Sequence, residues 1–130
     1  MSTDEATVRA LLNAMGRMDL GAIEGLLTDD VEWWLAGDLA VSGRHVGREA
    51  VLRDFLAAAA GMFEPGSLAF EVTHLWAHSG TVVAEYVGTA RSRRGDAYRN
   101  HYCVVFTCRA GQVSAVREYL DTEHVARVLV

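Results

Sequence analysis

Three polar residues fall on faces of a predicted β-hairpin that are otherwise apolar. The hairpin has a first strand over Tyr98–Arg109, a two-residue turn, and a second strand over Gln112–Leu120. Because side chains alternate between the two faces of a strand, Asn100 and Tyr102 share the inward face of the first strand. Glu118 shares the inward face of the second strand. The other members of these inward faces include Val104, Phe106, Val116 and Leu120.

A carboxylate on a buried apolar face needs a partner, a shifted pKa or a chemical role. Burial would raise the pKa of Glu118 toward neutrality and suit it to act as a general acid or base. Asn100 and Tyr102 are candidate hydrogen-bond donors to a substrate oxygen. The alternatives are a salt bridge from Glu118 to an arginine, and a tyrosine packed in the core with its hydroxyl at the rim.

The candidate substrate-binding residues are Trp33, Leu35, His74, Tyr86, Tyr102 and Val116. His74 lies on the predicted inward face of its strand, where it could act as an acid or base near pH 7. The alternative is a core histidine that forms a hydrogen bond with a neighbour. Trp33 and Trp34 are adjacent in a strand and must face opposite ways, and the sequence leaves open which one lines a cavity.

Several kinds of catalytic site are excluded by the residues present. The histidines and cysteines lack His-x-x-x-His and Cys-x-x-Cys spacing, and there is no Gly-rich phosphate loop or Gly-x-Ser-x-Gly turn. All twelve basic residues are arginine, so no lysine can form a Schiff base. We therefore expect no metal and no cofactor.

The composition limits the classes of binding partner and the cellular compartment that we expect. A chain of 130 residues predicts a single domain spanning residues 1–130, and a net charge of −5 argues against nucleic acid. No apolar run approaches the roughly 20 residues of a membrane span, which argues against a membrane partner. Cys103 and Cys108 fall on opposite strand faces and make no disulfide framework, so we expect a reducing, cytoplasmic setting.

Helical spacing of apolar residues predicts three helices in the N-terminal half. The first begins at Ser2, with a glutamate three residues later that fits a capping box. The second is capped by Asp19 and stopped by Thr28–Asp30, and the third begins near Gly47 and ends at Glu64–Gly66. The residues predicted to face the core are Val8, Leu11, Leu12, Met15, Leu20, Ile23, Leu26, Leu27, Val51, Leu52, Phe55, Ala58, Ala59 and Met62.

The remaining elements are predicted strands. They comprise Val31–Ala36, followed by a Gly37–Gly47 loop, then Ser67–Ala77, Thr81–Arg91, the hairpin, and a terminal helix capped by Thr122. Helices followed by a meander of long antiparallel strands predict an α+β fold. Such a sheet should curl around the helices and leave a concave mouth for a small ligand.

The segments LLTDDVEWWLAG, GRHVGREAV, VVAEYVGTA, YRNHYCVVF and REYLDT resemble the nuclear transport factor 2-like superfamily. The closest branch is the SnoaL-like one, which includes polyketide cyclases and relatives of ketosteroid isomerase and limonene epoxide hydrolase. The resemblance implies a cone in which a curved antiparallel sheet wraps around N-terminal helices. It leaves the activity open, since this fold hosts isomerases, cyclases, dehydratases, hydrolases and non-catalytic binders.

Compared with ketosteroid isomerases, this sequence lacks two of the catalytic residues and keeps a polar residue at a third catalytic position. The position of their general-base aspartate is Leu35 here, and their helix-one tyrosine falls near Leu11. Both differences argue against steroid isomerisation. Their oxyanion-binding aspartate falls at Asn100, which can donate a hydrogen bond.

The resemblance to limonene epoxide hydrolases is also incomplete. Their Arg-x-Asp pair falls on Tyr86 and Gly88, so that half of the chemistry is missing, whereas their last aspartate falls on Glu118. We therefore expect a cofactor-free enzyme that acts on a small apolar, oxygenated molecule by acid–base chemistry.

Two alternatives stay open, a binding module for a hydrophobic metabolite and an interaction scaffold. The scaffold would have its cavity filled by Trp33, Phe55 and Met62. A homodimer through the sheet is expected in each case, because the predicted outer face is too apolar for water. The residues of that outer face are Val83, Val87, His101, Cys103 and Val105.

Overall fold

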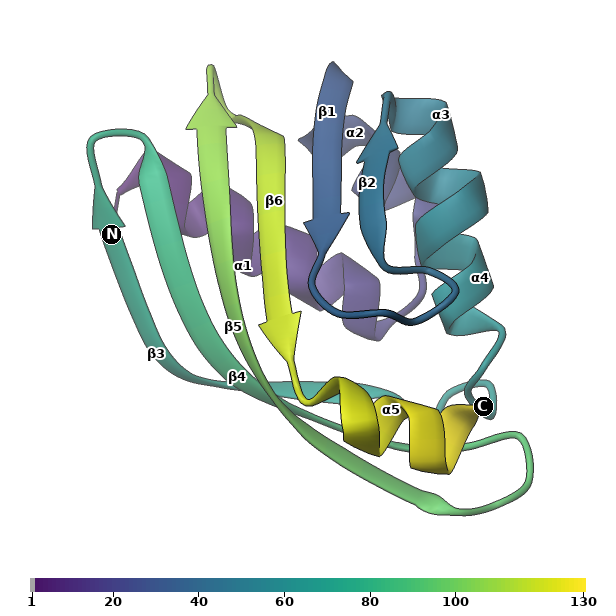
Figure 1. Cartoon of the computed structure of the whole chain (residues 1–130). Helices are drawn as coiled ribbons and strands as arrows, with labels where there is room; N and C mark the ends of the chain where they lie inside the picture. The colour runs from purple at the N-terminus through teal and green to yellow at the C-terminus, as the bar shows by residue number, and fades with distance from the viewer. Residues whose placement is uncertain (1) are drawn as a thin grey trace.

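The computed structural model describes residues 2–130 and confirms the predicted α+β class. Its elements are α1 (Thr3–Gly16), α2 (Leu20–Leu26), β1 (Leu27–Leu35), β2 (Gly43–Val46), α3 (Arg48–Ala50), η1 (Val51–Leu56), α4 (Ala57–Ala60), β3 (Ala69–His78), β4 (Thr81–Arg91), β5 (Ala97–Arg109), β6 (Gln112–Leu120) and α5 (Thr122–Leu129). The strands form one sheet in the order β2-β1-β6-β5-β4-β3 (Figure 1). Four of its strand pairs are antiparallel, and β1 pairs with β6 in parallel.

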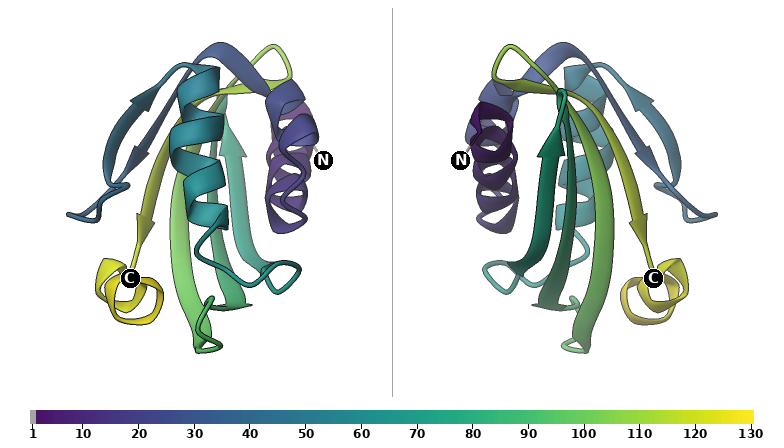
Figure 2. Two further views of the ribbon diagram at one scale, coloured as in Figure 1. Left: turned by 90° about the vertical axis from the view of Figure 1, so that its right-hand side faces the viewer. Right: turned by 90° about the vertical axis from the view of Figure 1, so that its left-hand side faces the viewer.

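The sheet bends around α1, α2 and the helical segment α3–η1–α4, which lie on its concave side (Figure 2). The main hydrophobic core fills the space between these helices and the inner face of the sheet. A second, smaller cluster of Phe63, Tyr98 and Val125 packs α5 against the far end of the sheet. Among residues 2–130, no helix is long and apolar enough to cross a membrane.

The first two helices begin where their capping residues predict. Ser2 Oγ accepts a hydrogen bond from the Glu5 backbone N–H at 3.1 Å, and Asp19 Oδ1 accepts one from the Ala22 N–H at 3.1 Å. Within these two helices, Leu20 was predicted to face inward but is 41% exposed. As the first residue of α2, it lies at the corner where the chain leaves α1.

The predicted stop at residues 28–30 is wrong, because β1 already begins at Leu27. Asp29 and Asp30 are poor strand formers, but each contacts an arginine of another element: Arg48 at 2.8 Å and Arg109 at 2.8 Å, respectively. The predicted 37–47 loop is also wrong in part, since it contains β2, which pairs with β1.

The predicted third helix is confirmed in position but is wound differently. Its middle is a π-helix, in which the Ala57 N–H donates to the carbonyl of Leu52, five residues back. The wider turn places Val51, Phe55 and Leu56 in the core and leaves Ala58 exposed. The prediction that Ala58 faces inward is therefore wrong.

The prediction that His74 faces inward is also wrong. Val72 pairs with Tyr86, but His74 pairs with Glu85, so Thr73 is an extra residue in β3. The alternation inverts after this bulge, so that Leu75 turns toward the core and His74 turns outward. The His74 side chain is 60% exposed, and its Nδ1 lies 3.3 Å from Glu85.

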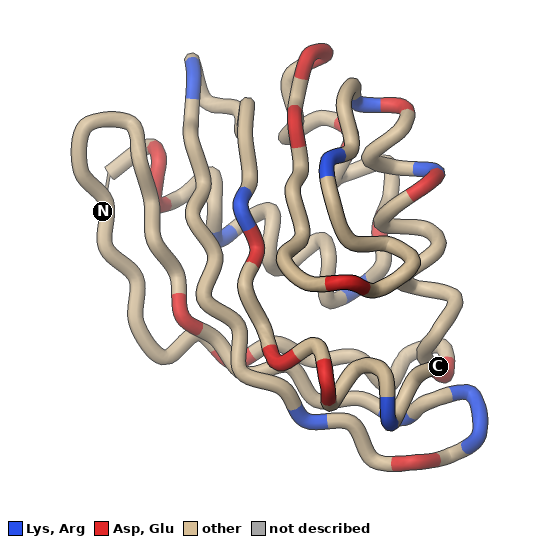
Figure 3. The backbone as a smooth tube through the Cα atoms, in the orientation of Figure 1, with Lys and Arg blue, Asp and Glu red and all other residues tan. Residues whose placement is uncertain are grey.

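The C-terminal hairpin is confirmed, with the predicted inward faces of β5 and β6. The cap of α5 is Asp121, one residue before the predicted Thr122. The β4–β5 turn carries a basic cluster of Arg91, Arg93 and Arg94. The turn lies beside the C-terminus (Figure 3), where Arg94 donates to the carbonyls of Val128 and Val130. This contact gives the cluster a structural role.

Candidate active site

A narrow apolar cavity of about 80 Å³ lies between the helices and the concave face of the sheet. Its polar lining consists of Tyr102 from β5 and Glu118 from β6. The apolar lining consists of Met15, Met18, Leu20, Ile23, Phe55, Leu56, Ala59, Ala60, Phe63, Leu68 and Phe70. The cavity is smaller than the roughly 300–1,000 Å³ of typical ligand pockets, so a ligand must displace some of these side chains.

Glu118 is a buried carboxyl group that faces this cavity and is 7% exposed. The indole N–H of Trp33 donates to its Oε1 at 2.8 Å. Burial raises the pKa of Glu118 from an ordinary 4.5 to about 7, and the Trp33 hydrogen bond opposes this shift. Both protonation states of the carboxyl group are therefore accessible near neutral pH.

Tyr102 is the last member of a chain of buried hydrogen bonds. Its Oη lies 2.6 Å from the Oη of Tyr98, which in turn accepts from Asn100 Nδ2 at 3.0 Å. Burial raises the pKa of Tyr102 well above its ordinary value, so its phenol stays protonated. If Tyr98 uses its own hydrogen toward Tyr102, the hydrogen of Tyr102 is free to point into the cavity.

Asn100 lies behind the tyrosines rather than in the cavity lining. Its Nδ2 also donates to the Asp121 carbonyl at 3.0 Å, and its Oδ1 accepts from the Asp121 N–H at 3.1 Å. Both amide hydrogens are thus engaged by the protein. The side chain joins β5 to the start of α5 and fixes the position of Tyr98.

Tyr86 lies beneath the cavity and supports Tyr102. The two rings stack with centroids 5.0 Å apart, and the edge of Phe70 contacts Tyr86 at a centroid distance of 5.1 Å. Gly88 makes room for this cluster, because a Cβ atom there would lie 2.8 Å from Tyr102 and 3.1 Å from Phe70. Glycine, which has no side chain, is therefore required at this position of β4.

The other predicted contacts are core residues. Trp33 is fully buried and reaches the site through Glu118, whereas Trp34 faces outward and packs on Tyr119. Leu35 on β1 and Val116 on β6 are buried, and both are absent from the cavity lining.

Sequence reasoning missed most of the helical wall of the cavity. Met15, Leu56 and Ala59 belong to helices that reach the cavity only after the sheet has curled around them. Helical periodicity marked Met15 and Ala59 as inward, but it could not distinguish a cavity wall from the core.

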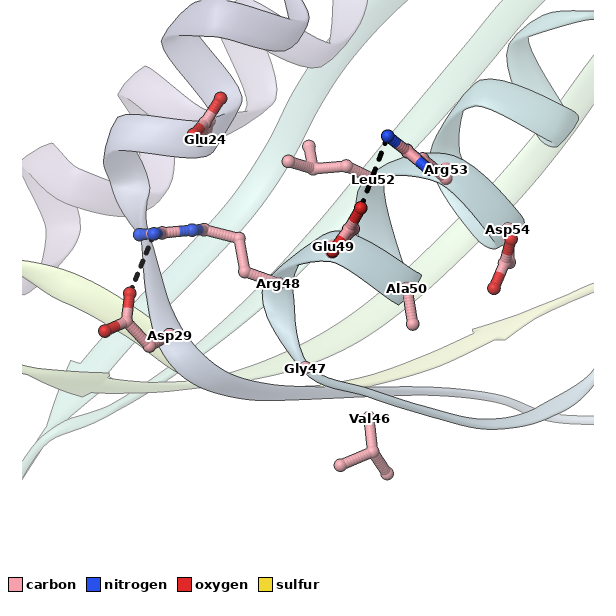
Figure 4. A pocket seen from close by; sticks show the side chains of 10 residues that line it. All are labelled: Glu24, Asp29, Val46, Gly47, Arg48, Glu49, Ala50, Leu52, Arg53 and Asp54. Carbon is pink, nitrogen blue, oxygen red and sulfur yellow. Dashed lines mark ion pairs between the residues drawn. The ribbon is translucent and has the colours of Figure 1, made fainter.

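A wider and more open hollow lies elsewhere, between α2, the end of β2 and the start of the helical segment (Figure 4). Arg48 and Arg53 point there toward separate acidic partners, with Arg48–Asp29 at 2.8 Å and Arg53–Glu49 at 3.3 Å. The hollow is open, and its charges pair locally instead of converging on one point. Residues 2–130 contain no cluster of three or more potential metal ligands.

Glu118 and Tyr102 bring a titratable carboxyl group and a phenol hydrogen-bond donor to the same cavity. Val104 pairs with Glu118 across the two strands, so Tyr102 is the diagonal neighbour of Glu118 on the same face. A ligand oxygen held by Tyr102 would therefore place adjacent carbon atoms near the carboxyl group. This geometry suits proton transfer next to a polarised oxygen.

Solved structures share this fold over almost the whole chain. An NTF2-like protein of Burkholderia pseudomallei has a TM-score of 0.89 at 18% identity, covering 100% of this chain and 99% of its own. TerC, co-crystallised with polyporic acid, has a TM-score of 0.86 at 19% identity, with 98% of both chains covered. An LEH-like epoxide hydrolase of M. tuberculosis has a TM-score of 0.78 at 20% identity, covering 98% of this chain and 89% of its own.

No curated protein matches the sequence significantly. The SnoaL-like domain family matches residues 8–116, which include both strands of the cavity hairpin up to Val116. The chain belongs to the SnoaL-like domain family, and it has the NTF2-like fold.

Proposed function

We propose that the protein is a cofactor-free enzyme that acts on a small apolar, oxygenated molecule by acid–base chemistry. The observation that carries this proposal is the Glu118 carboxyl group, buried in an apolar cavity with its pKa raised to about 7. A purely structural carboxyl group in the core would not need to face a cavity. Isomerisation, cyclisation, dehydration and hydrolysis are all compatible with such a pair.

In the simplest reaction, Tyr102 donates a hydrogen bond to a substrate carbonyl oxygen. The Glu118 carboxylate takes a proton from the neighbouring carbon, and the electron pair of the broken C–H bond moves into an enolate. The protonated Glu118 then returns the proton to another carbon of the same molecule, which regenerates the carboxylate. The reaction needs no oxidant, no reductant and no second substrate, so it requires no cofactor.

Three of the other predicted site residues act through these two. Trp33 orients Glu118 by donating to Oε1, and Asn100 positions Tyr102 through Tyr98. Tyr86 supports the Tyr102 ring from below. Asn100 is therefore proposed as a positioning residue, in place of the direct substrate contact expected from the sequence.

A thermal-shift and turnover screen against decalones, small polyketides and epoxides tests the proposal on the wild type and on Glu118→Gln. The variant keeps the shape of the side chain but cannot accept or donate the catalytic proton. We expect ligands that stabilise both proteins and are converted only by the wild type. Glu85→Gln is the matched control, because Glu85 lies on the outer face and contacts His74.

The alternative functions give different results. A carrier of hydrophobic metabolites would be stabilised equally in wild type and Glu118→Gln, with no conversion by either. An interaction scaffold would respond to none of the compounds. Either result would refute the catalytic role of Glu118.

We also infer that the protein works as a single-domain homodimer in the cytoplasm. The dimer is supported by the outward-facing valines of β4 and β5 and by the exposed Trp76 on β3.

A further inference from the structure

Met18 occupies a backbone position that usually belongs to glycine. It lies in the left-handed region, with φ 55°, directly after α1. The Asp19 N–H donates to the carbonyl of Ala14 at 3.0 Å, and the Met18 N–H donates to that of Met15 at 3.1 Å. These are the two hydrogen bonds of a Schellman motif, whose left-handed residue is most often glycine because a side chain there is strained.

The two other left-handed residues with side chains have local explanations. Ser79 and Ala110 are each followed by a glycine that also has positive φ, Gly80 and Gly111. Both pairs form the two-residue turns of β-hairpins, where two successive positive φ angles fit the strand twist. Met18 has no such explanation, because the Schellman bonds would form equally well with glycine.

What distinguishes Met18 is its side chain, which lines the cavity beside Met15 and Leu20. Leu20 is itself exposed, so this corner between α1 and α2 forms the mouth of the cavity. Methionine is unbranched and flexible, and it adapts to the shape of an apolar neighbour better than other hydrophobic residues. A flexible side chain at the mouth of a cavity of about 80 Å³ can move to admit a larger molecule.

We propose that Met18 is a further binding residue, which contacts the apolar end of the ligand, remote from Glu118. Its thioether closes the mouth of the cavity over a bound hydrocarbon ring. The left-handed strain is retained because glycine would remove this contact. The inference rests on the proposed ligand cavity but not on the chemistry of Glu118.

The test compares Met18→Gly and Met18→Asn with the wild type, using toluene and 2-decalone as probes. Glycine and asparagine both tolerate left-handed backbone, and neither supplies a thioether. Ala110→Gly is the matched control, because it relieves the same strain in a hairpin turn that does not line the cavity. Affinities are measured by NMR titration and stability by the melting temperature.

We expect both Met18 variants to bind each probe about fivefold more weakly, the loss expected for removing roughly one methylene's worth of apolar contact. Met18→Gly should melt no lower than the wild type, since the relief of strain offsets the lost packing. Ala110→Gly should melt about 3 °C higher with unchanged affinities.

Three results would overturn the proposal. They are affinities within twofold of wild type for Met18→Gly, weakened binding in Met18→Gly but not in Met18→Asn, or no binding of toluene by any of the proteins. The second result would assign the effect to backbone flexibility instead of the thioether. Toluene has no oxygen, so a Met18 effect on toluene stands even when 2-decalone is not converted, a result that would refute only the proposed chemistry.

Discussion

Two opposing effects act on the Glu118 carboxyl group. Burial favours the neutral acid, and the Trp33 N–H favours the carboxylate by donating to Oε1. Among residues 2–130, no side chain or backbone donor is bonded to Oε2. The proton of the acid form therefore belongs on Oε2, the oxygen that Trp33 leaves free to meet a ligand.

This buried acid predicts a specific dependence of stability on pH. The pKa of Glu118 is about 7 in the folded protein, against an ordinary 4.5. Between these values the folded protein holds a proton that the unfolded chain has released, so the free energy of unfolding decreases as pH rises from 4.5 to 7. The contribution is fully present below pH 4.5, is lost above pH 7, and amounts to about 3 kcal/mol.

Urea unfolding of wild type and Glu118→Gln between pH 5 and pH 8 measures this effect. The glutamine variant cannot titrate, so its free energy of unfolding should lack this part of the decrease. The gap between the two proteins should therefore change steadily from pH 5 to about pH 7 and level off above it, since all other groups contribute equally to both. Parallel curves would mean that Glu118 titrates as an ordinary exposed carboxyl group.

Strand alternation placed Asn100, Tyr102 and Glu118 on the inner face, and the structure confirms that placement. What alternation could not show is how their polar atoms are used. Asn100 donates its two amide hydrogens to the Tyr98 hydroxyl and to the Asp121 carbonyl. These partners depend on where the start of α5 meets β5, which no local pattern in the sequence encodes.

At the scale of elements, single extra residues decide which side chains reach the cavity. The bulge at Thr73 turns His74 outward, and the π-helix shifts Leu56 inward. Periods of 2 and 3.6 describe regular strands and helices, so a sequence pattern that assumes them fails after each irregularity.

The close contact of Gly88 with the rings of Tyr102 and Phe70 predicts that Gly88→Ala destabilises the protein. Its Cβ atom would lie 2.8 Å from the Tyr102 ring and 3.1 Å from Phe70, so these rings must move away. We expect the free energy of unfolding to fall by about 1–3 kcal/mol, as for other overpacked cores. Displacement of Tyr102 should also reduce turnover of any substrate identified in the screen.

Chemical denaturation and the near-ultraviolet circular dichroism of the tyrosines measure the Gly88→Ala effect. Gly25→Ala is the control, because a Cβ atom at Gly25 would contact nothing within 4 Å. Gly88→Ala with wild-type stability and an unchanged tyrosine signal would show that the cluster can relax without cost.

For the whole molecule, residue patterns were sufficient to predict the α+β class, the curled sheet and the family. The parallel pairing of β1 with β6 was not predicted, because the two strands lie at opposite ends of the sequence. Local periodicity gives the elements but not which distant strands become neighbours. The bond from Trp33 to Glu118 was missed for the same reason.

The outer face of the sheet predicts a homodimer. Val83, Val87 and Val105 face outward and are only half-buried in the isolated chain. Val105→Glu would place a carboxylate beside Arg117, its neighbour on β6, so the fold should tolerate the change. The same carboxylate would be buried in a sheet-to-sheet interface, so the variant should be monomeric.

Sedimentation equilibrium of the wild type and Val105→Glu measures the mass in solution. Arg9→Gln is the control, since Arg9 is exposed on α1, among the helices on the opposite side of the sheet. A wild type that sediments as a monomer would refute the dimer, and a dimeric Val105→Glu would move the interface to another face.

The parallel β1–β6 pair also has a consequence for biosynthesis. Trp33 and Glu118 are separated by 85 positions in the chain, and β1 has only the short β2 beside it until β6 arrives. A nascent chain therefore holds β1 with one edge open until β6 has left the ribosome. The strand that closes this edge also carries the cavity carboxyl group, so a chain whose β6 is not yet released has neither a closed sheet nor Glu118 in place.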